Sequence, residues 1–303
     1  MDASIVVPSY RSEGTIKICL DNLLNQDTEY SYEVIVVDSS PDDRVESIVK
    51  KIDKVKFIKL NQKTYPGIAR NLGAQTATGE LLIFVDADVV LPRDTLTKTI
   101  LYYKAGHNVF SGSVSLWYNK KVTVCNKLEY FFEFGDFKPS MTEGVRWCLP
   151  SIFLAVKSPV FLKYGFTNMP SSEDVELTVR MKKDNMLLHF NPQIQVYHIF
   201  QKGFKDILKK AFHFGITNIA VRKMHQVQGS AVFKMGLLAY VIIPMFAMIK
   251  LLKISWRALR YDGWLDKILY IFIFPSIVIL VMAWMFGAYH GLGKNERLSA
   301  TWQ

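Results

Sequence analysis

Short runs of β-branched and other apolar residues alternate with helical patterns over the first hundred residues of this chain. Helical spacing covers Gly14–Gln26, and a short helical pattern over Ile68–Ala77 follows Pro66-Gly67. The apolar runs are Ser4–Pro8, Glu33–Asp38, Val55–Leu60 and Leu81–Asp86. Strands that alternate with helices in this way predict βαβ units and a parallel sheet. We therefore expect an α/β fold whose first half resembles a nucleotide-binding fold.

The next hundred residues are less regular. They contain strand patterns at Phe110–Trp117, Ile152–Val156 and Ile194–His198, and a helical pattern over Val175–Lys183. We expect residues 1–200 to form one domain with two halves. Residues 1–100 would bind a nucleotide, and residues 101–200 would bind the second substrate, the acceptor of the group that the nucleotide carries.

Polar residues follow three of the predicted strands. These are Pro8-Ser9-Tyr10, Asp38, and the pair Asp86 and Asp88 after Ile83-Phe84-Val85. Ligands of such sheets bind at the carboxyl ends of the strands. Two carboxylates at a strand end suit Mg²⁺ or Mn²⁺, which can hold the diphosphate of a nucleotide. An isolated Asp-x-Asp is common in surface turns, so its position after a strand matters.

With these motifs in order, the chain resembles the family-two glycosyltransferases, which have the GT-A fold: a mostly parallel sheet flanked by helices. The matching donor-side motifs are Val7-Pro8-Ser9-Tyr10-Arg11 with Glu13, Val36-Val37-Asp38, Gly67-Ile68-Ala69-Arg70-Asn71-Leu72-Gly73, and Asp86-Ala87-Asp88. The resemblance implies that Pro8, Tyr10, Glu13, Asp38, Arg70 and Asp86 bind the donor. Asp38 would contact the base, and Arg70 would meet phosphate or sugar oxygens. Asp88 would bind the metal, with Asp86 at the ribose or supporting the metal shell.

The acceptor-side motifs come later in the chain. They are Ser171-Ser172-Glu173-Asp174 followed by Arg180, and Val196-Tyr197-His198. By resemblance, Asp174 is the catalytic base, Glu173 and Arg180 lie at the acceptor, and His198 adds a metal contact. Trp147 is a further candidate for the acceptor groove.

Several of these residues have simpler explanations. Asp38 could form a strand-end turn, and Asp174 could cap the helix that follows it. His198 could be a structural histidine, and Trp147 could pack in the core.

The expected reaction is an inverting transfer of a sugar from a nucleotide-diphosphate donor to a hydroxyl of a lipid-linked or saccharide acceptor. Asp174 would take the proton, and the metal would take up charge on the departing diphosphate. Two alternatives remain: a polyprenyl-phosphate sugar synthase and a non-catalytic nucleotide-sugar-binding scaffold. Glu173 and Asp174 are adjacent and point apart, which disfavours a retaining hydrolase. No Gly-x-Gly-x-x-Gly follows the first strand, which disfavours a dehydrogenase.

The excess positive charge lies entirely in the last third of the chain. Residues 1–199 hold 23 basic and 23 acidic side chains, whereas residues 200–303 hold 14 and 4. The same region has the longest apolar runs, so anionic lipid is a better partner than nucleic acid. Three scattered cysteines and the absence of a leader before the first strand predict a cytosolic catalytic domain.

The C-terminal region predicts attachment to the inner (plasma) membrane. An amphipathic interfacial helix is expected within residues 201–230, because Phe204, Ile207, Leu208, Ala211, Phe212, Gly215 and Ile219 share one face. Residues 231–303 form a membrane region with candidate segments 235–252 and 268–289. The second segment is long enough to span a bilayer, and the first is marginal. The basic residues between them leave a spanning hairpin and a re-entrant first segment as alternatives.

Overall fold

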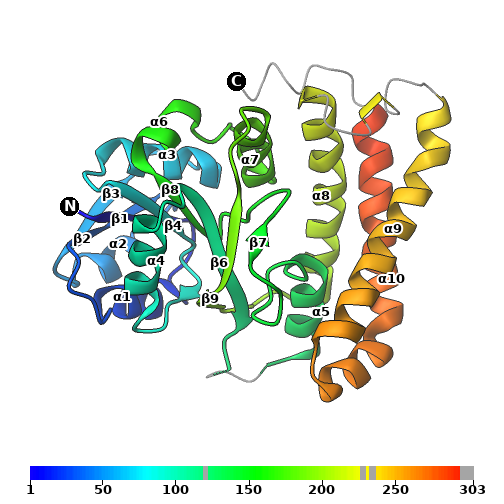
Figure 1. Ribbon diagram of the computed structural model, residues 1–303, viewed down its shortest axis with the longest axis horizontal. Helices are drawn as coiled ribbons and strands as arrows, with labels where there is room; N and C mark the ends of the chain where they lie inside the picture. Colours follow the sequence, from blue (N-terminus) through cyan, green and yellow to red (C-terminus); the bar gives the residue numbers. More distant parts are fainter. Residues whose placement is uncertain (119–121, 226–229, 232–236, 294–303) are drawn as a thin grey trace. The chain divides into compact units, whose positions relative to one another are not determined.

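The computed structural model describes residues 1–118, 122–225, 230–231 and 237–293 (Figure 1). The chain divides into two compact units. Unit 1 contains Met1–Trp117 and Thr142–Ile199, and unit 2 contains Tyr118–Met141 and Phe200–Gln303. Residues 118–141 thus belong to the same compact unit as the C-terminal region.

Unit 1 is an α/β unit. Its strands are β1 (Ala3–Ser9), β2 (Tyr32–Asp38), β3 (Val55–Lys59), β4 (Leu81–Val85), β5 (Val89–Val90), β6 (Val109–Leu116), β7 (Gly144–Val145), β8 (Phe153–Lys157) and β9 (His189–His198). Its helices are α1 (Ile16–Leu24), α2 (Arg44–Val49), α3 (Pro66–Thr76), α4 (Thr95–Lys104), α6 (Ser158–Tyr164) and α7 (Glu173–Lys183). Each strand predicted from the sequence is present.

The strands form one sheet with two different halves. Among the described residues the order is β3-β2-β1-β4-β8-β6-β9-β5, and β7 pairs with β9. The pairs among β1 to β4 are all parallel. Beyond β4 the sheet is mixed, since β8 is antiparallel to β4 and β6 whereas β6 and β9 are parallel. The parallel pairing predicted for the first hundred residues is therefore present, and the sheet as a whole is mixed.

Apolar side chains explain the parallel half. Its central strands β1 and β4 are buried along nearly their whole length, which suits strands covered on both faces. Helix α3 lies close to β1, because a Cβ at Gly73 would be 2.4 Å from Val6 Cγ1. Pro66 in the first turn of α3 has the fixed φ that a helix start favours.

Unit 2 is helical in its described residues. Its helices are α5 (Val124–Glu133), α8 (Phe204–His225), α9 (Leu237–Tyr261) and α10 (Trp264–Gly293). Thr123 and Asn126 form a capping box that begins α5. Helices α8 and α10 touch through their backbones, since a Cβ at Gly215 would be 2.0 Å from Trp284 O and one at Gly287 would be 1.9 Å from Phe212 O.

Ion pairs tie α5 and the residues after it to the other helices of unit 2. Glu129 and Glu133 of α5 both accept hydrogen bonds from Lys210 of α8. Lys138, which is 2% exposed, pairs with Asp262 at 2.6 Å in the turn between α9 and α10. Burial of these charges is compatible with a stable fold because each is paired.

The predicted C-terminal elements correspond to three of these helices. Ile207, Ala211, Gly215 and Ile219 of the predicted apolar face are buried in α8, whereas Phe204 is exposed. Two segments are long and apolar enough to cross a membrane, Leu238–Tyr261 and Trp264–Gly293. Residues 226–229 of the predicted 201–230 helix, 235–236 of segment 235–252, and 232–236 and 294–303 of the predicted membrane region lie outside the described residues.

Candidate active site

The carboxyl ends of β1, β2 and β3 meet around Asp38. Ser9 lies opposite Asp38 in the strand register, and Asp38 lies opposite Lys59. Oδ1 of Asp38 accepts hydrogen bonds from Ser9 Oγ at 2.9 Å and from Ser40 Oγ at 2.7 Å. Oδ2 accepts from Lys59 Nζ at 3.0 Å. These hydrogen bonds hold the three strand ends together around Asp38, which is fully buried. A direct contact between Asp38 and a base would require its side chain to leave these partners.

An exposed aromatic ring with cations beside it follows β1. The Tyr10 side chain is 38% exposed, Lys63 Nζ lies 4.9 Å from its ring centroid, and Arg11 Cζ lies 5.5 Å from it. The backbone of Arg11 is left-handed, with φ of 51°, and its N–H donates to Ser40 Oγ at 2.8 Å. A ring that can stack on a base and two cations that can meet phosphates form a surface suited to a nucleotide.

Two further predicted donor residues lie near this edge. Pro8 is half-buried in β1 and pairs in register with Val37. Glu13 Oε1 forms an ion pair with Arg44 at 2.6 Å. Glu13 Oε2 is buried and has no hydrogen-bond partner among the described residues. A buried carboxylate oxygen in this state can accept a ligand hydroxyl at low cost.

Arg70 of α3 bridges two carboxylates from distant parts of unit 1. One terminal guanidinium nitrogen donates to Asp86 Oδ1 at 2.6 Å, and the other donates to Glu173 Oε1 at 2.8 Å. Arg70 is 2% exposed and its Cζ lies 5.3 Å from the Phe166 ring. Arg70 thus holds Asp86 and Glu173 together, while its buried Nε has no hydrogen-bond partner among the described residues, and its contact with donor oxygens stays a prediction.

Asp86 and Asp88 follow β4, as predicted. The Asp86 N–H donates to Ile152 O at 3.2 Å, which anchors the motif beside β8. Burial raises the pKa of Asp86; Arg70 opposes this rise, and the Asp88 carboxylate adds to it. A divalent cation would relieve this repulsion between the two carboxylates.

The short β5–β9 pairing brings Asp88 beside His198. Val89 lies opposite His198 in the register, and Ile199 N–H donates to Asp88 O at 2.8 Å. His198 Nε2 lies 3.2 Å from Asp88 Oδ2. The Asp88 side chain is 39% exposed, whereas the His198 side chain is largely buried. The structure therefore places the two predicted metal residues together, 110 positions apart in the chain.

The donor set of Asp88 and His198 fits a metal that also binds a diphosphate. Within the described part of the chain, no group of three His, Cys, Asp or Glu side chains could hold a metal ion without further ligands. Mg²⁺ is usually held by one or two protein ligands together with water and substrate phosphates. Mn²⁺ accepts the same ligands, and an imidazole nitrogen suits it better than it suits Mg²⁺.

Asp174 lies in the first turn of α7, where negative charge is favourable. Its Oδ2 accepts a hydrogen bond from Ser151 N at 3.1 Å, and its Oδ1 accepts one from Val175 N at 2.7 Å. Burial and the adjacent Glu173 charge raise the pKa of Asp174 to about 6. A carboxylate with this pKa is ionised at neutral pH and is a stronger base than an ordinary aspartate.

Three residues predicted at the acceptor have different surroundings. Glu173 is buried and accepts a hydrogen bond from Arg70, so it forms one end of the bridge Asp86–Arg70–Glu173. Arg180 donates to both oxygens of Glu176 and to the carbonyl oxygens of Tyr164 and Gly165. Its guanidinium thereby ties α7 to the end of α6, which does not support acceptor binding. Trp147 is 41% exposed, so the alternative that it packs in the core is wrong.

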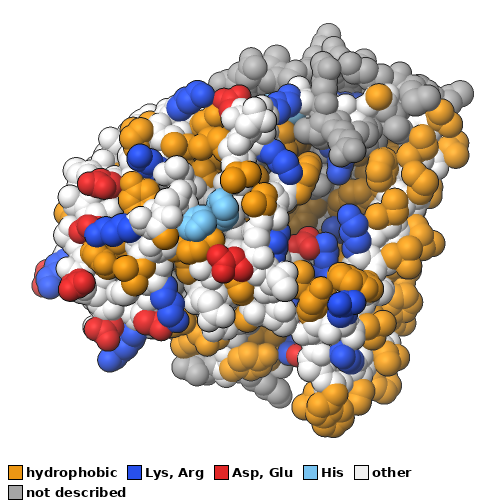
Figure 2. All heavy atoms as spheres, viewed as in Figure 1, with side chains coloured by type: hydrophobic (Ala, Val, Ile, Leu, Met, Phe, Trp, Pro, Cys, Tyr) orange, Lys and Arg blue, Asp and Glu red, His pale blue; other side chains and the backbone are white. Residues whose placement is uncertain are grey.

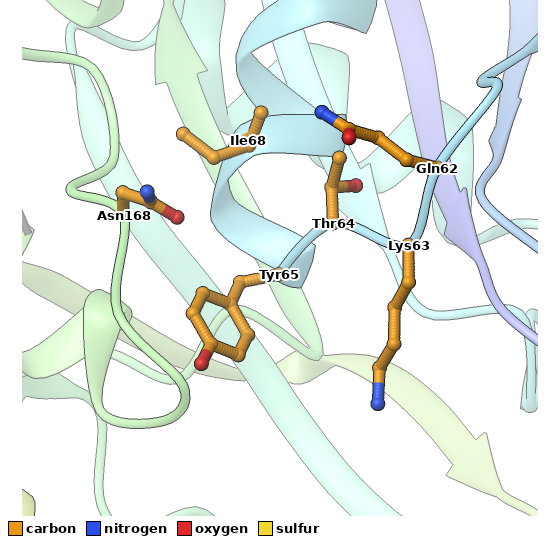
Figure 3. Close-up of a pocket in the computed structure, with 6 residues that line it drawn as sticks. All are labelled: Gln62, Lys63, Thr64, Tyr65, Ile68 and Asn168. Carbon is orange, nitrogen blue, oxygen red and sulfur yellow. The ribbon is translucent and has the colours of Figure 1, made fainter.

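The loop between β3 and α3 borders a pocket that the sequence analysis missed. The pocket has a volume of about 480 Å³ (Figure 3). It is lined by Gln62, Lys63, Thr64, Tyr65, Ile68 and Asn168. Gly67, which precedes the lining residue Ile68, lies close to Glu173, because a Cβ at Gly67 would be 2.9 Å from Thr167 O and 3.4 Å from Glu173 Cγ. The sequence could have indicated this pocket. The polar loop follows a strand of the parallel half of the sheet, and ligands bind at the carboxyl ends of such strands.

Comparisons with known proteins agree with this geometry. Residues 4–152 match the model of the family described as glycosyl transferase family 2. The chain is 33% identical over 113 residues to poly(ribitol-phosphate) β-N-acetylglucosaminyltransferase TarS of Staphylococcus aureus, a match that covers 36% of this chain and 20% of TarS. It is 22% identical to a dolichyl N-acetyl-α-D-glucosaminyl phosphate glucuronosyltransferase of Methanococcus voltae, over 73% of this chain and 74% of that protein.

Solved structures confirm the predicted GT-A fold. The mannosyltransferase PcManGT of Pyrobaculum calidifontis, solved with GDP-Man and Mn²⁺, is similar with a TM-score of 0.64. Its sequence is 16% identical, and the match covers 97% of this chain and 88% of that one. At this identity the likeness concerns the fold.

Proposed function

We propose that this chain, whose residues 4–152 match the glycosyl transferase family 2 model, transfers a sugar with inversion. The donor would be a nucleoside diphosphate sugar, and the acceptor a hydroxyl of a lipid-linked or saccharide molecule. The observation that carries the proposal is that Asp86 and Asp174 meet at the two residues just before β8. Asp86 donates its N–H to Ile152 O, and Asp174 accepts from the N–H of the neighbouring Ser151. The backbone of the proposed donor-side Asp86 and the carboxylate of the proposed base Asp174 are thus anchored on consecutive residues.

We assign the donor to the edge formed by the ends of β1, β3 and β4. The Tyr10 ring would stack on the base, with Lys63 and Arg11 close enough to meet phosphate oxygens. Glu13 Oε2 is available to a donor hydroxyl. Asp88 and His198 would hold Mn²⁺ or Mg²⁺, which when bound neutralises charge on the departing diphosphate.

Asp174 is proposed as the general base. Both of its oxygens are oriented by backbone N–H groups, so the carboxylate is held in place without losing its capacity to accept a proton. The acceptor hydroxyl would give its proton to Asp174 as it attacks the anomeric carbon. Trp147 offers an exposed ring on which a sugar acceptor could lie. Arg70 and Glu173 act indirectly, because they position Asp86 and set the charge beside Asp174.

We further propose that the protein works at the cytosolic face of the inner (plasma) membrane. The exposed apolar residues of α9 and α10 support contact with lipid, and the Methanococcus voltae relative is named for a dolichyl-linked acceptor. A lipid-linked acceptor would be delivered by that membrane. Membrane lipids, the donor and the acceptor are therefore the proposed partners.

The test is metal-dependent release of a nucleoside diphosphate from a panel of nucleotide sugars, with matched variants. Asp174→Asn should lose about 10²- to 10⁴-fold in turnover while donor binding, followed by calorimetry, is kept. Asp88→Ala should lose metal-dependent donor binding. Asp184→Asn is the control, because this carboxylate lies at the other end of α7 and is exposed.

Two results would contradict the assignment. Full turnover by Asp174→Asn with hydroxyl acceptors would exclude the base role. Full turnover by this variant with a polyprenyl phosphate acceptor would favour the polyprenyl-phosphate synthase, whose anionic nucleophile needs no base. Donor binding by the unchanged protein without product across a broad acceptor panel would favour the non-catalytic scaffold.

A further inference from the structure

Helix α9 has an apolar face that the described residues of unit 2 leave exposed. The exposed side chains recur every three or four residues, the spacing of one helical face. They include Leu238, Val241, Met245, Leu252, Trp256 and Leu259. The opposite face is buried at Ala239, Ile243, Ala247, Ile254 and Ala258. A continuous apolar face of this length marks a site of contact with a protein or a membrane.

Helix α10 has a similar face. Trp264, Ile268, Phe272, Ile279, Met282 and Phe286 are exposed at helical spacing, and Phe272 is 77% exposed. Figure 2 shows apolar side chains gathered over the outer surface of α9 and α10. We call these two sets of exposed residues the outer face of the helix pair. A spanning hairpin and a surface-bound pair would both expose them, so other contacts must distinguish the two.

The turn between α9 and α10 is tied to the segment that contains α5. Lys138 pairs with Asp262 in the turn, and Lys127 pairs with Asp266 at 2.7 Å in the first turn of α10. Arg257 near the end of α9 pairs with Asp136. The α9–α10 turn therefore lies on the same side of a membrane as α5.

The length of the chain fixes which side that is. Six residues, 118–123, join Trp117 of unit 1 to the start of α5. Even fully extended, the seven residue steps from Trp117 to Val124 span only about 25 Å, whereas the hydrocarbon core of a bilayer is about 30 Å thick. Helix α5, and with it the α9–α10 turn, must share the side of the membrane on which unit 1 lies. A hairpin that crosses the bilayer would place its turn on the opposite side.

Helix α8 adds an independent argument. It runs parallel to α10, because Gly215 meets Gly287 and, further along both helices, Lys223 Nζ donates to Leu292 O at 3.0 Å. Charged residues end at Lys210 and resume at Arg222, which leaves 11 residues, or about 17 Å of helix, without Lys, Arg, Asp or Glu. If α10 crossed the bilayer, α8 beside it would carry charges into the hydrocarbon core, where each is strongly unfavourable.

We infer that α9 and α10 attach the protein to one leaflet of a membrane through their outer face and do not cross it. The occupant of the face is a lipid surface with anionic headgroups. Lys253 and Arg260 are exposed on α9 between or beside the apolar residues, and the C-terminal region carries 14 basic and 4 acidic side chains. Basic residues next to an apolar helical face are typical of helices that lie in the membrane interface. The inference builds on the membrane attachment proposed above and specifies its geometry.

Cysteine labelling from the two sides of sealed membranes tests the topology of the full-length protein. Gly263→Cys places a thiol in the α9–α10 turn, before α10, and Gly293→Cys places one at the other end of α10; a Cβ meets nothing within 4 Å at Gly263 and only the Tyr240 hydroxyl, at 3.9 Å, at Gly293. The background replaces Cys125 and Cys148 with Ser. With a membrane-impermeant maleimide, both thiols should react in inside-out vesicles of the inner membrane and neither in right-side-out vesicles. Any crossing of the bilayer by α10 would put the two thiols on opposite sides, so labelling of either one in right-side-out vesicles alone would overturn the inference.

Flotation with lipid vesicles tests the outer face itself. Leu252→Asp should abolish flotation with vesicles of phosphatidylcholine and phosphatidylglycerol, whereas Leu187→Asp, at an equally exposed leucine of unit 1, should leave it unchanged. Omitting phosphatidylglycerol should weaken binding of the unchanged protein. If the unchanged protein fails to float and Leu252→Asp instead converts a dimer to a monomer in light scattering, a second copy covers the face and the inference is wrong. Neither readout depends on sugar transfer, so both remain valid if the proposed enzymatic function fails.

Discussion

Replacing Glu173 with Gln should lower the pKa of Asp174 and move the acid limb of the pH–rate profile to lower pH. The pKa of Asp174 stands at about 6 in the native protein, against an ordinary value of 3.8. A rise of about two pH units corresponds to about 3 kcal/mol by which burial and the Glu173 charge disfavour the ionised form. Since a general base acts only when deprotonated, activity should rise as pH passes through about 6.

The substitution removes one of the two causes of this shift. Gln keeps the size of Glu and its acceptor oxygen, so the hydrogen bond from Arg70 can remain. The charge of Arg70 would then be less neutralised, which also favours the ionised form of Asp174. The burial of Asp174 persists in this variant. The midpoint of the acid limb should therefore lie between about pH 6 and the ordinary Asp pKa of 3.8. The expected shift is therefore a fraction of the two units.

The assay is kcat/KM for the nucleotide sugar as a function of pH, followed by release of the nucleoside diphosphate. Glu29→Gln, a change at an exposed carboxylate outside the site, is the control and should leave the limb near pH 6. An unchanged limb in Glu173→Gln, or a limb moved to higher pH, would refute the assignment of Asp174 as the titrating base.

Three further predictions concern stability and the metal. Gly112→Ala should lower the free energy of unfolding by about 1–3 kcal/mol in urea titrations, because its Cβ would be 2.0 Å from Ile194 O; a loss below experimental error would contradict the close approach. Lys138→Met should cost about 3–5 kcal/mol by leaving Asp262 buried and unpaired, and Asp262→Leu in the same protein should recover most of it in thermal unfolding. Chelation should abolish turnover and Mn²⁺ should restore it, but Mn²⁺ should not rescue Asp88→Ala.

The strands could be predicted to within a few residues because their signal is local. A run such as Ile83-Phe84-Val85 is apolar, short and followed by carboxylates, which suffices to recognise a buried strand and its functional end. The carboxyl-end rule then placed Asp86 correctly at the edge of the sheet. Helix α2, with six residues, offers too short a pattern to be recognised in this way.

The roles of charged residues could not be predicted as well, because their partners are distant in sequence. Arg70 lies 103 positions from Glu173, and no local pattern indicates that the two form a buried pair. Arg180 was expected at the acceptor, yet its hydrogen bonds to Tyr164 and Gly165 form only once α6 and α7 meet. The grouping of residues 118–141 with the C-terminal helices likewise depends on ion pairs to residues more than 100 positions away.

The glycine contact between α8 and α10 limits how far the chain can be shortened for purification. Gly215 and Gly287 bring the two backbones together. Removing α10 would therefore expose the apolar side of α8 to solvent. Shortening the chain at its C-terminal end would therefore yield aggregates. Polar substitutions at exposed positions such as Phe272 and Val241 would instead reduce the exposed apolar surface and leave the buried contacts of the described residues in place.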